Sequence, residues 1–278
     1  MPSVRIYLPA EELRGYVTFY YFVETSGPLS DFLYPEWGNV RFAVSGEWRA
    51  EMAGVYPSEQ HFNCIFGPTD RCGRVTASEG KVVGFGVTAL GWRRVIGGDA
   101  SMMANRVRPY RGELGMSGHE LEAAFAPNAP DAGGVAQLDR LLIERVKNRP
   151  PEDALAIAVD RVLRTRPADV SAFAATVGVS QRTLHRLCLR TFGFAPKRLL
   201  RRQRFLDTLG QFRSAVGNSL EASLDSEYTD QPHFYRDFRD FMGMSPRAYF
   251  GAERKLMAEA AAAQKAAGVT LSFELPPL

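Results

Sequence analysis

The chain has 278 residues, of which 45% are hydrophobic and 23% are charged, and its formal net charge is +3. This length allows two domains, and the average composition argues against a largely disordered chain. No apolar run is long enough to span a membrane, and the first residues lack the basic start and apolar core of a secretion signal. We therefore expect a cytoplasmic protein, with free thiols at Cys64, Cys72 and Cys188 because none of them forms a Cys-x-x-Cys pair.

Positive charge is concentrated in one block of the sequence. Residues 165–250 contain 13 Lys and Arg against 8 Asp and Glu, whereas residues 1–164 contain 18 against 20. Twelve of the 13 cations in the block are arginines, whose guanidinium groups pair with phosphates and base edges. The block therefore suits a nucleic-acid partner, although a solvated helical face gives the same signal when taken alone.

The first 110 residues are expected to form mostly β-structure. Residues 40–44 (VRFAV) and 81–87 (KVVGFGV) alternate large apolar residues with small or polar ones, as half-buried strands do. Short strands separated by turn signals pack most simply as a barrel or sandwich. The aromatic residues of this region either fill its core or enclose an apolar effector, and the candidate lining residues are Trp37, Phe42, Trp48, Phe85 and Trp92.

A helical segment is expected next. Leu121 and Phe125 mark one helix, and Val135, Leu138, Leu142 and Val146 form an apolar stripe along a second one. This stripe either packs on the β-domain or pairs with its twin in a second chain, and we favour the second interpretation, a homodimer. Residues 148–151 (NRPP) end the helix and mark the boundary before the basic block.

The basic block opens with the pattern of two short helices joined by a tight turn. The expected first helix is 172–176, and in the turn over 177–179 Gly178 can adopt a positive φ. Ser180 then caps the second helix by accepting a hydrogen bond from a free backbone N–H, and Gly193 ends it. This is the helix-turn-helix pattern, in which the second helix enters the major groove of DNA. The outward side chains of that helix are Gln181, Arg182, His185, Arg186 and Arg190.

A second copy of the pattern follows. We expect a short helix over 219–226, a turn around Glu227, and a second helix over 231–242 in which Pro232 fits the first turn. Its outward side chains include Gln231, His233, Arg236 and Arg239. Asp237 and Asp240 are expected to hold arginines in place at spacings of three or four.

An Arg-rich helix over 196–213 links the two copies. At about 1.5 Å per residue it would hold them roughly one turn of DNA apart. Its arginines cannot all face one way, so we expect some to pair with carboxylates and one or two, Arg202 among them, to touch DNA. Beyond Phe250, residues 253–268 are helix-prone and the remaining residues form a loose tail.

The block 165–250 resembles the tandem helix-turn-helix DNA-binding domain of the AraC/XylS family of bacterial transcription regulators. The phrases GVSQRTLHRL, FGFAPKRLLRRQRF and YTDQPHFYRDFRDFMGMSP carry the resemblance, and Glu227 departs from it because the family usually has glycine in that turn. The predicted DNA-binding residues are Ser180, Gln181, Arg182, His185, Arg186, Arg190, Arg202, Gln231, His233, Arg236 and Arg239.

The N-terminal part resembles, less specifically, the cupin-like β-domains that precede such DNA-binding domains. The matching phrases include YPEWGNVRFAVSG and VVGFGVTALGWRRVIGGDA. The expected fold class is α+β, an N-terminal cupin-like β-barrel followed by an all-α tandem helix-turn-helix domain. The expected divisions are a sensor and dimerisation barrel (1–118), linking helices (119–150), the DNA-binding domain (151–252) and a C-terminal helix with its tail (253–278).

Enzyme activity, a metal and a cofactor are not expected. A metal-binding cupin needs clustered histidines with a carboxylate, whereas this region has only His61 and His119, far apart in the sequence. Residues 84–91 (GFGVTALG) are no dinucleotide fingerprint, because the third glycine is misplaced and no βαβ unit surrounds it. Cys64 and Cys72 form either a redox sensor or, as we favour, a set of buried inert thiols.

The favoured function is that of a sequence-specific DNA-binding transcription regulator such as an activator, modulated by a small effector in the N-terminal domain. Its expected partners are double-stranded DNA, RNA polymerase and a second copy of the chain. The alternative is a small-molecule-binding or enzymatic barrel that does not bind DNA and whose basic helical appendage merely packs.

Overall fold

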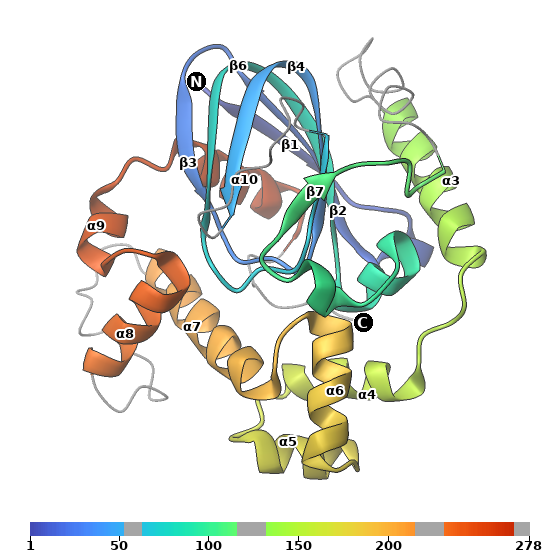
Figure 1. Cartoon of the computed structure of the whole chain (residues 1–278). Coiled ribbons are helices and arrows are strands. Elements are labelled where there is room, and N and C mark those ends of the chain that lie inside the picture. The colour runs from blue at the N-terminus through green and yellow to red at the C-terminus, as the bar shows by residue number, and fades with distance from the viewer. Residues whose placement is uncertain (53–62, 116–131, 215–230, 270–278) are drawn as a thin grey trace.

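Figure 1 shows the computed structural model of the chain, which describes residues 1–52, 63–115, 132–214 and 231–269. An antiparallel sheet in the N-terminal part is followed by a helical C-terminal part, so the expected α+β class is confirmed. Within the described ranges, no helix has both the length and the apolar character that crossing a membrane requires.

The seven described strands belong to one sheet. Their bounds are β1 (Ser3–Tyr7), β2 (Val17–Thr25), β3 (Leu29–Leu33), β4 (Asn39–Met52), β5 (Cys64–Phe66), β6 (Gly73–Val87) and β7 (Val107–Pro109). The order is β1-β2-β6-β4-β5-β7, and β3 also pairs with β6. The first part of β6 pairs with β3 and the second part with β2, while β4 runs beside both parts. The strands expected over 40–44 and 81–87 lie within β4 and β6.

The sheet changes register where β4 and β6 face each other at two glycines. Gly46 and Gly80 are paired, with φ of +77° and +127°, and the register shifts on either side of Gly46. A Cβ on Gly46 would lie 1.9 Å from the carbonyl oxygen of Glu79, and one on Gly80 would lie 2.1 Å from that of Ser45. Only glycine fits this pair, because the two backbones approach each other too closely for any side chain.

Each face of the sheet carries its own apolar core, because successive residues of a strand point to opposite faces. On β6, Val83 and Phe85 belong to one core, whereas Val82 belongs to the other with Trp48 of β4. A 3-10 turn (Glu11–Leu13) and the helix α3 (Ala132–Lys147) cover the first core. The C-terminal helix α10 (Lys255–Ala266) covers the second core through Leu256.

The apolar stripe on α3 is buried within the chain itself. Leu138, Leu142 and Val146 are 4%, 0% and 7% exposed and pack in the first core, with Val135 partly buried beside them. The stripe therefore packs on the β-domain, and the favoured interpretation that it pairs with a second chain is wrong. Leu121 and Phe125, like His61 and His119, lie outside the described residues.

The remaining helices lie below and beside the sheet in Figure 1. After α1 (Ala89–Gly91) and the short turns Trp92–Ile96 and Ala100–Met103 come α4 (Ala154–Arg164), α5 (Val170–Val177), α6 (Gln181–Phe192), α7 (Pro196–Ser214), α8 (Gln231–Met242) and α9 (Pro246–Gly251). The helices expected over 172–176, 196–213 and 231–242 are confirmed. The one expected over 219–226, with Glu227, lies outside the described residues. The sequence interpretation missed α4, although Asp153 caps it.

Two separate apolar cores hold the helical part together. Helices α4, α5 and α6 share one of them, which contains Phe173 and Leu184. In the other, Phe205 of α7 is fully buried and stacks on Phe241 of α8 with ring centroids 5.0 Å apart. Phe234 and Phe238 pack against the same ring. The helix pair α5 and α6 is thus part of a small packed unit, and α7 runs from that unit to a second one that contains α8 and α9.

Replacing Phe205 by alanine should lower the free energy of unfolding by about 3–5 kcal/mol, because it leaves a cavity among three other phenylalanine rings. Phe205→Leu keeps most of the volume and should cost less than half as much. Urea unfolding followed by circular dichroism measures both variants, and equal losses for the two would contradict this packing.

Candidate functional site

The first helix-turn-helix unit has the caps and the turn that the sequence indicates. Ser180 Oγ accepts a hydrogen bond from the backbone N–H of Thr183 at 3.1 Å and begins α6. Asp169 caps α5 in the same way, with 2.8 Å between its carboxylate and the N–H of Ala172. Gly178 has φ of +78°, which makes the turn between the helices possible without strain. The turn and the caps therefore fix the direction in which α6 leaves the unit.

Helix α6 has a buried face and an exposed basic face. Leu184, Leu187 and Cys188 are buried in the core of the unit. The opposite face exposes a row of side chains that make no hydrogen bond or ion pair with any described residue, namely Gln181, Arg182, His185 and Arg186. A row of long polar side chains left free in this way can bind an external partner.

Arg190, which was also predicted to contact DNA, is engaged within the protein. Its guanidinium donates to Asp153 Oδ2 at 3.2 Å. The other oxygen of Asp153 accepts the backbone N–H of Leu155 at the start of α4. Arg190 therefore ties the end of α6 to α4, an arrangement that leaves it less free to contact DNA than Arg182 or Arg186.

In the second unit, α8 likewise has one buried and one exposed face. Phe234, Phe238 and Phe241 are fully buried. His233, Arg236 and Arg239 are exposed on the outward face. Gln231 begins α8, but its side chain lies outside the described part of the chain.

Two arginines near the start of α7 bind this helix to α8 and to the β-domain. Arg198 forms ion pairs with Asp70, in the loop before β6, and with Asp240 of α8. Arg201 donates to Asp237 Oδ1 at 2.5 Å and to Asp240 Oδ2 at 3.1 Å. Asp237 and Asp240 were expected to hold arginines of their own helix; they bind arginines of α7 instead, because α7 packs across α8.

The charges in this cluster stabilise one another. Partial burial works to raise the pKa of Asp240, but its bonds and charge interactions with Arg198 and Arg201 outweigh this effect and hold the pKa below its ordinary value. The hydrogen bond with Asp237 is the largest of the causes that raise the pKa of Arg201. Both groups are therefore charged throughout the neutral range.

Arg202 is buried, and this contradicts the prediction that it contacts DNA. The residue is 3% exposed, its Nε donates to the carbonyl oxygen of Thr69 at 3.2 Å, and its guanidinium lies 4.0 Å from the ring of Trp37. Burial lowers its pKa to about 10, so it still carries its charge at neutral pH. Arg202 is a contact between α7 and the β-domain rather than part of an exposed surface.

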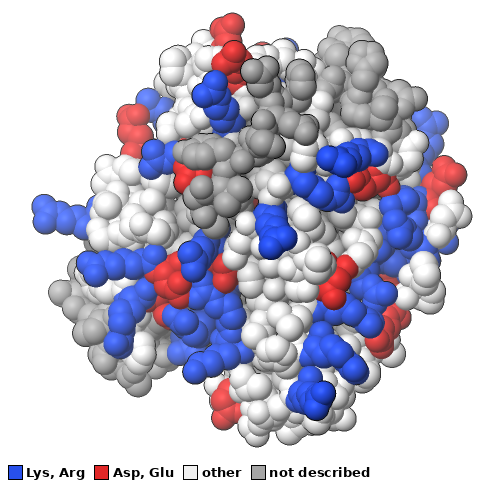
Figure 2. Space-filling view, in the orientation of Figure 1, with Lys and Arg blue, Asp and Glu red and all other residues white. Residues whose placement is uncertain are grey.

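Figure 2 shows where basic side chains gather on one face of the molecule. Lys and Arg cover two parts of the lower half, one over α7 and α8 and one around α6 and α4, with mostly uncharged surface between them and acidic groups beside each. The helical part therefore has two basic regions rather than one continuous stripe. Two separate regions are what two DNA-contacting units would produce.

A cavity of about 260 Å³ lies between the sheet and the C-terminal helices. The sheet, the loop 34–38, Arg202 of α7 and one side of α10 form its walls. Most of the lining is apolar and includes Val4, Ile6, Phe19, Val23, Leu33, Trp37, Trp48, Val75, Val82, Val87, Leu256 and Met257. Such a hollow with few polar groups is the usual form of a small-molecule site.

One end of the cavity carries a network of buried polar groups. Arg41, which is 7% exposed, pairs with Glu36 at 2.5 Å, and its Nε donates to the hydroxyl of Tyr21 at 2.9 Å. Burial opposes the charge of Arg41, but Glu36 and Tyr21 outweigh this and raise its pKa. Asn39 joins the network by accepting from Tyr21 at 2.5 Å and donating to Glu36 at 2.9 Å.

Two donors at the cavity stay unused by the described residues. Arg41 Nη1 and Trp37 Nε1 are both buried, and neither has a hydrogen-bond partner within the described ranges. Both residues line the cavity. A buried donor without an acceptor costs free energy, so such groups are rare and call for an explanation.

The aromatic residues proposed from the sequence to line an effector pocket separate into two groups. Trp37 and Trp48 line the cavity. Phe42, Phe85 and Trp92 are buried in the first core, on the opposite face of the sheet, and do not line it. Sequence analysis missed Tyr21, Asn39 and Arg41. Strand alternation places Arg41 on the face opposite to Val40 and Phe42, and nothing in the sequence indicated that this face is buried as well.

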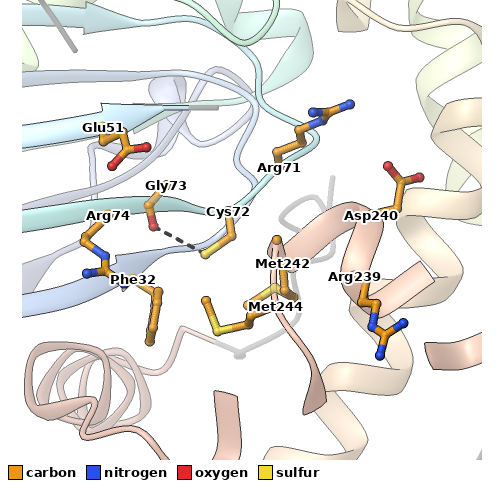
Figure 3. Close-up of a pocket in the computed structure, with 11 residues that line it drawn as sticks. Phe32, Glu51, Arg71, Cys72, Gly73, Arg74, Arg239, Asp240, Met242 and Met244 are labelled. Carbon is orange, nitrogen blue, oxygen red and sulfur yellow. Dashed lines mark hydrogen bonds between the residues drawn. The ribbon is translucent and has the colours of Figure 1, made fainter. Parts of the chain in front are cut away.

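A second hollow, of about 460 Å³, lies between the β-domain and the end of α8 (Figure 3). Cys72, Met242 and Met244 lie at its centre, with Arg74 on one side and Arg71 and Arg239 on the other. The Cys72 thiol donates to the carbonyl of Gly73 at 3.3 Å, and burial raises its pKa to about 12. The thiol is therefore protonated at neutral pH and poorly reactive, as expected for an inert cysteine.

Arg201→Ala should lower the free energy of unfolding by about 2 kcal/mol, since it removes the arginine that bonds the nearly buried carboxylate of Asp237. The exposed Arg182 serves as the matched control, and Arg182→Ala should change stability by less than about 0.5 kcal/mol. Urea unfolding at neutral pH measures both. Equal effects of the two substitutions would show that the α7 cluster does not hold the units together.

The helical part of the chain matches a known family of domains. A family model described as a helix-turn-helix domain matches residues 173–252, and no curated protein matches the chain. Among solved structures, ToxT from Vibrio cholerae is similar with a TM-score of 0.46 and 11% identity, covering 83% of this chain and 96% of ToxT. ToxT with a bound unsaturated fatty acid gives a TM-score of 0.41 at 9% identity, covering 81% of this chain and 95% of ToxT. The AraC-like transcriptional activator CuxR gives a TM-score of 0.28 at 15% identity, covering 73% of this chain and 86% of CuxR.

The matched block runs from within α5 to the end of α9 and contains the exposed rows of both α6 and α8. It is the same block whose sequence resembles the AraC/XylS regulators, so that prediction is confirmed. Residues 173–252 of the chain therefore contain a helix-turn-helix domain of the AraC type.

Proposed function

We propose that the chain is a sequence-specific regulator whose helices α6 and α8 enter two neighbouring stretches of the major groove and whose β-domain binds a small effector. One observation supports sequence-specific DNA binding most directly. The capped helix α6 exposes a row of side chains without partners among the described residues, namely Gln181, Arg182, His185 and Arg186. Glutamine and arginine side chains pair with adenine and guanine edges, respectively. A helix of this kind is the usual reading element of a helix-turn-helix unit.

The roles of the side chains follow from their places on the helices. Gln181 and Arg182 lie in the first turn of α6, the end that contacts bases in such units, and we assign them to base edges. Ser180, His185 and Arg186 are assigned to bases or nearby phosphates. On α8, Gln231, His233 and Arg236 take the equivalent role, and Arg239 takes a phosphate.

Helix α7 sets the separation of the two units. Its 19 residues span about 28 Å, close to one turn of DNA. The helix lies between α6 and α8 in Figure 1, and its arginines bind α8. The two units are therefore held at a defined spacing, which suits two contacts along the same duplex.

Arg182→Ala should weaken binding to a DNA site selected from random oligonucleotides by roughly tenfold, as loss of a base contact does. Arg186→Ala should weaken all sequences similarly and reduce the slope of log affinity against log salt by about 1. Arg5→Ala, an exposed arginine on β1 far from the helical units, is the matched control and should bind like the unchanged protein. Gel-shift titrations at several salt concentrations measure all three. Unchanged affinity in Arg182→Ala would contradict the assignment of α6.

The effector part of the proposal depends on the cavity beside Trp37 and Arg41. An apolar molecule with one acceptor group would bury its body against the aliphatic and aromatic walls. Its acceptor would meet the two buried donors that lack partners, Arg41 Nη1 and Trp37 Nε1. The ligand would thereby remove the cost of leaving these two donors unpaired.

Charge favours an anionic end on this molecule. Two buried arginines, Arg41 and Arg202, line the cavity against the single carboxylate of Glu36, which leaves one positive charge in excess among these three groups. A carboxylate would neutralise this excess and accept hydrogen bonds from both free donors. We therefore propose a small apolar carboxylate as the effector class.

Trp37→Phe keeps an aromatic ring but removes the free N–H, so it should weaken binding of 1-naphthoate about tenfold while changing that of the uncharged 1-naphthylmethanol much less. Trp48→Phe is the matched control: Trp48 also lines the cavity, but its N–H already donates to the carbonyl of Ser45 at 3.2 Å. Trp48→Phe should not discriminate between the two compounds. Isothermal titration calorimetry measures both, and equal discrimination in the two variants would rule out this donor.

A homodimer and contact with RNA polymerase belong to the proposal as expectations from the family resemblance. Because the α3 stripe is buried in its own β-domain, a dimer must use another surface. Sedimentation of the full chain with and without its DNA site tests the stoichiometry.

A further inference from the structure

The loop before β6 is bonded directly to the end of α8. The backbone N–H of Cys72 donates to the carbonyl oxygen of Phe241 at 2.6 Å. Two residues earlier, Asp70 pairs with Arg198 of α7, and its backbone N–H donates to the side chain of Asn105 at 3.1 Å. This part of the β-domain is therefore held at a defined place beside α8.

Three exposed arginines surround the hollow of about 460 Å³ at this contact. Arg71 comes from the loop, Arg74 from the start of β6 and Arg239 from α8. Figure 3 shows Arg71 and Arg239 on the same side of the hollow. Neither of these two side chains makes a hydrogen bond or an ion pair with any residue that the structure describes. Both guanidinium groups are therefore available to an external partner.

The charged residues that line the hollow leave an excess of positive charge. They are three arginines and two carboxylates, Glu51 and Asp240. Glu51 is the cross-strand neighbour of Arg74 and balances that arginine. Asp240 already accepts hydrogen bonds from Arg198 and Arg201 of α7. No carboxylate in the described lining is thus left for Arg71 and Arg239, and the hollow suits an anion.

The exposed row on α8 leads to this hollow. His233, Arg236 and Arg239 follow one another at a spacing of three, which places them along one side of the helix. The 12 residues of α8 span about 18 Å, whereas the major groove is about 12 Å wide. When the first turn of α8 lies among the bases, the other end therefore reaches the backbone that borders the groove. Arg71 lies beside that end.

We propose that the β-domain itself binds DNA, with Arg71 and Arg239 together holding phosphates of the strand that borders the groove entered by α8. This contact rests on the proposed function and lies partly outside the helix-turn-helix domain. Arginine is well suited to it, because its planar group pairs bidentately with a phosphate. Contacts of this kind add affinity and fix position without reading sequence.

A free phosphate compound would use the same chemistry as the DNA backbone. The three arginines are exposed, and none of the described lining residues has a buried side-chain donor without a partner. A site for a small molecule would enclose its ligand, whereas a phosphate of a duplex needs only an open surface. Both observations favour DNA.

Arg71→Ala in the full chain tests the contact by gel shift at several salt concentrations and by phosphate-ethylation interference. We expect an affinity about fivefold lower at low salt, a slope of log affinity against log salt reduced by about 1, and an unchanged preference for the selected site. Interference should disappear at phosphates next to those lost in Arg239→Ala. Arg71→Lys keeps the charge and should keep the slope, and the exposed Arg5→Ala should match the unchanged protein.

A slope and an interference pattern in Arg71→Ala equal to those of the unchanged protein would overturn the contact, and a loss of affinity in Arg182→Ala would then leave the regulator proposal intact. An equal loss in Arg71→Lys would show a structural role instead. Calorimetric binding of inorganic pyrophosphate that Arg71→Ala abolishes, with an unchanged DNA slope, would assign the hollow to a free phosphate compound. Failure of the unchanged chain to select any DNA site would overturn the proposed function and this contact with it.

Discussion

Three arginines on one face of α7 fix how the halves of this protein meet. Arg201 and Arg202 lie three and four residues after Arg198, which places both of them beside Arg198 on the helix. Arg198 reaches Asp70 of the β-domain and Asp240 of α8, and Arg202 reaches the backbone of Thr69. Because guanidinium groups have several donors in a fixed plane, each can bind partners from two elements at once. Helix α7 is therefore a spacer between the helix-turn-helix units and also the part that docks them on the sheet.

The same contacts bring the cavity close to the DNA-binding half. Trp37 lines the cavity, lies under the guanidinium of Arg202, and packs edge-on against Phe192 at the end of α6, with ring centroids 5.3 Å apart. A small change at Trp37 is thus felt by two helices of the DNA-binding half without passing through a long chain of contacts. Close-packed interiors transmit such displacements because they have little free space.

Burying the polar groups at one end of the cavity is unfavourable, and hydrogen bonds within the protein offset only part of that free energy. Tyr21 and Glu36 accept hydrogen bonds from Nε and Nη2 of Arg41, and Asn39 connects these two acceptors to each other. In a low-dielectric interior these bonds are strong, and an unused donor beside them is correspondingly unfavourable. An apolar cavity with such a donor discriminates between ligands by the acceptor they carry rather than by their size alone, since a ligand without one leaves the donor unpaired.

The sequence by itself determined the elements that depend on short-range patterns. The cap at Ser180, the positive φ at Gly178 and the apolar spacing of α6 and α8 are local, so the first helix-turn-helix and the exposed rows of α6 and α8 could be predicted. Strands within β4 and β6 followed from their alternation. The partners of α3, Arg202 and Asp240 could not be predicted, because an apolar stripe or a charged side chain suits several partners equally well until the chain is folded. Only the tertiary structure decided that α3 covers its own sheet, that Arg202 is buried against Trp37, and that α10 returns to close a cavity, since these contacts join residues far apart in the sequence.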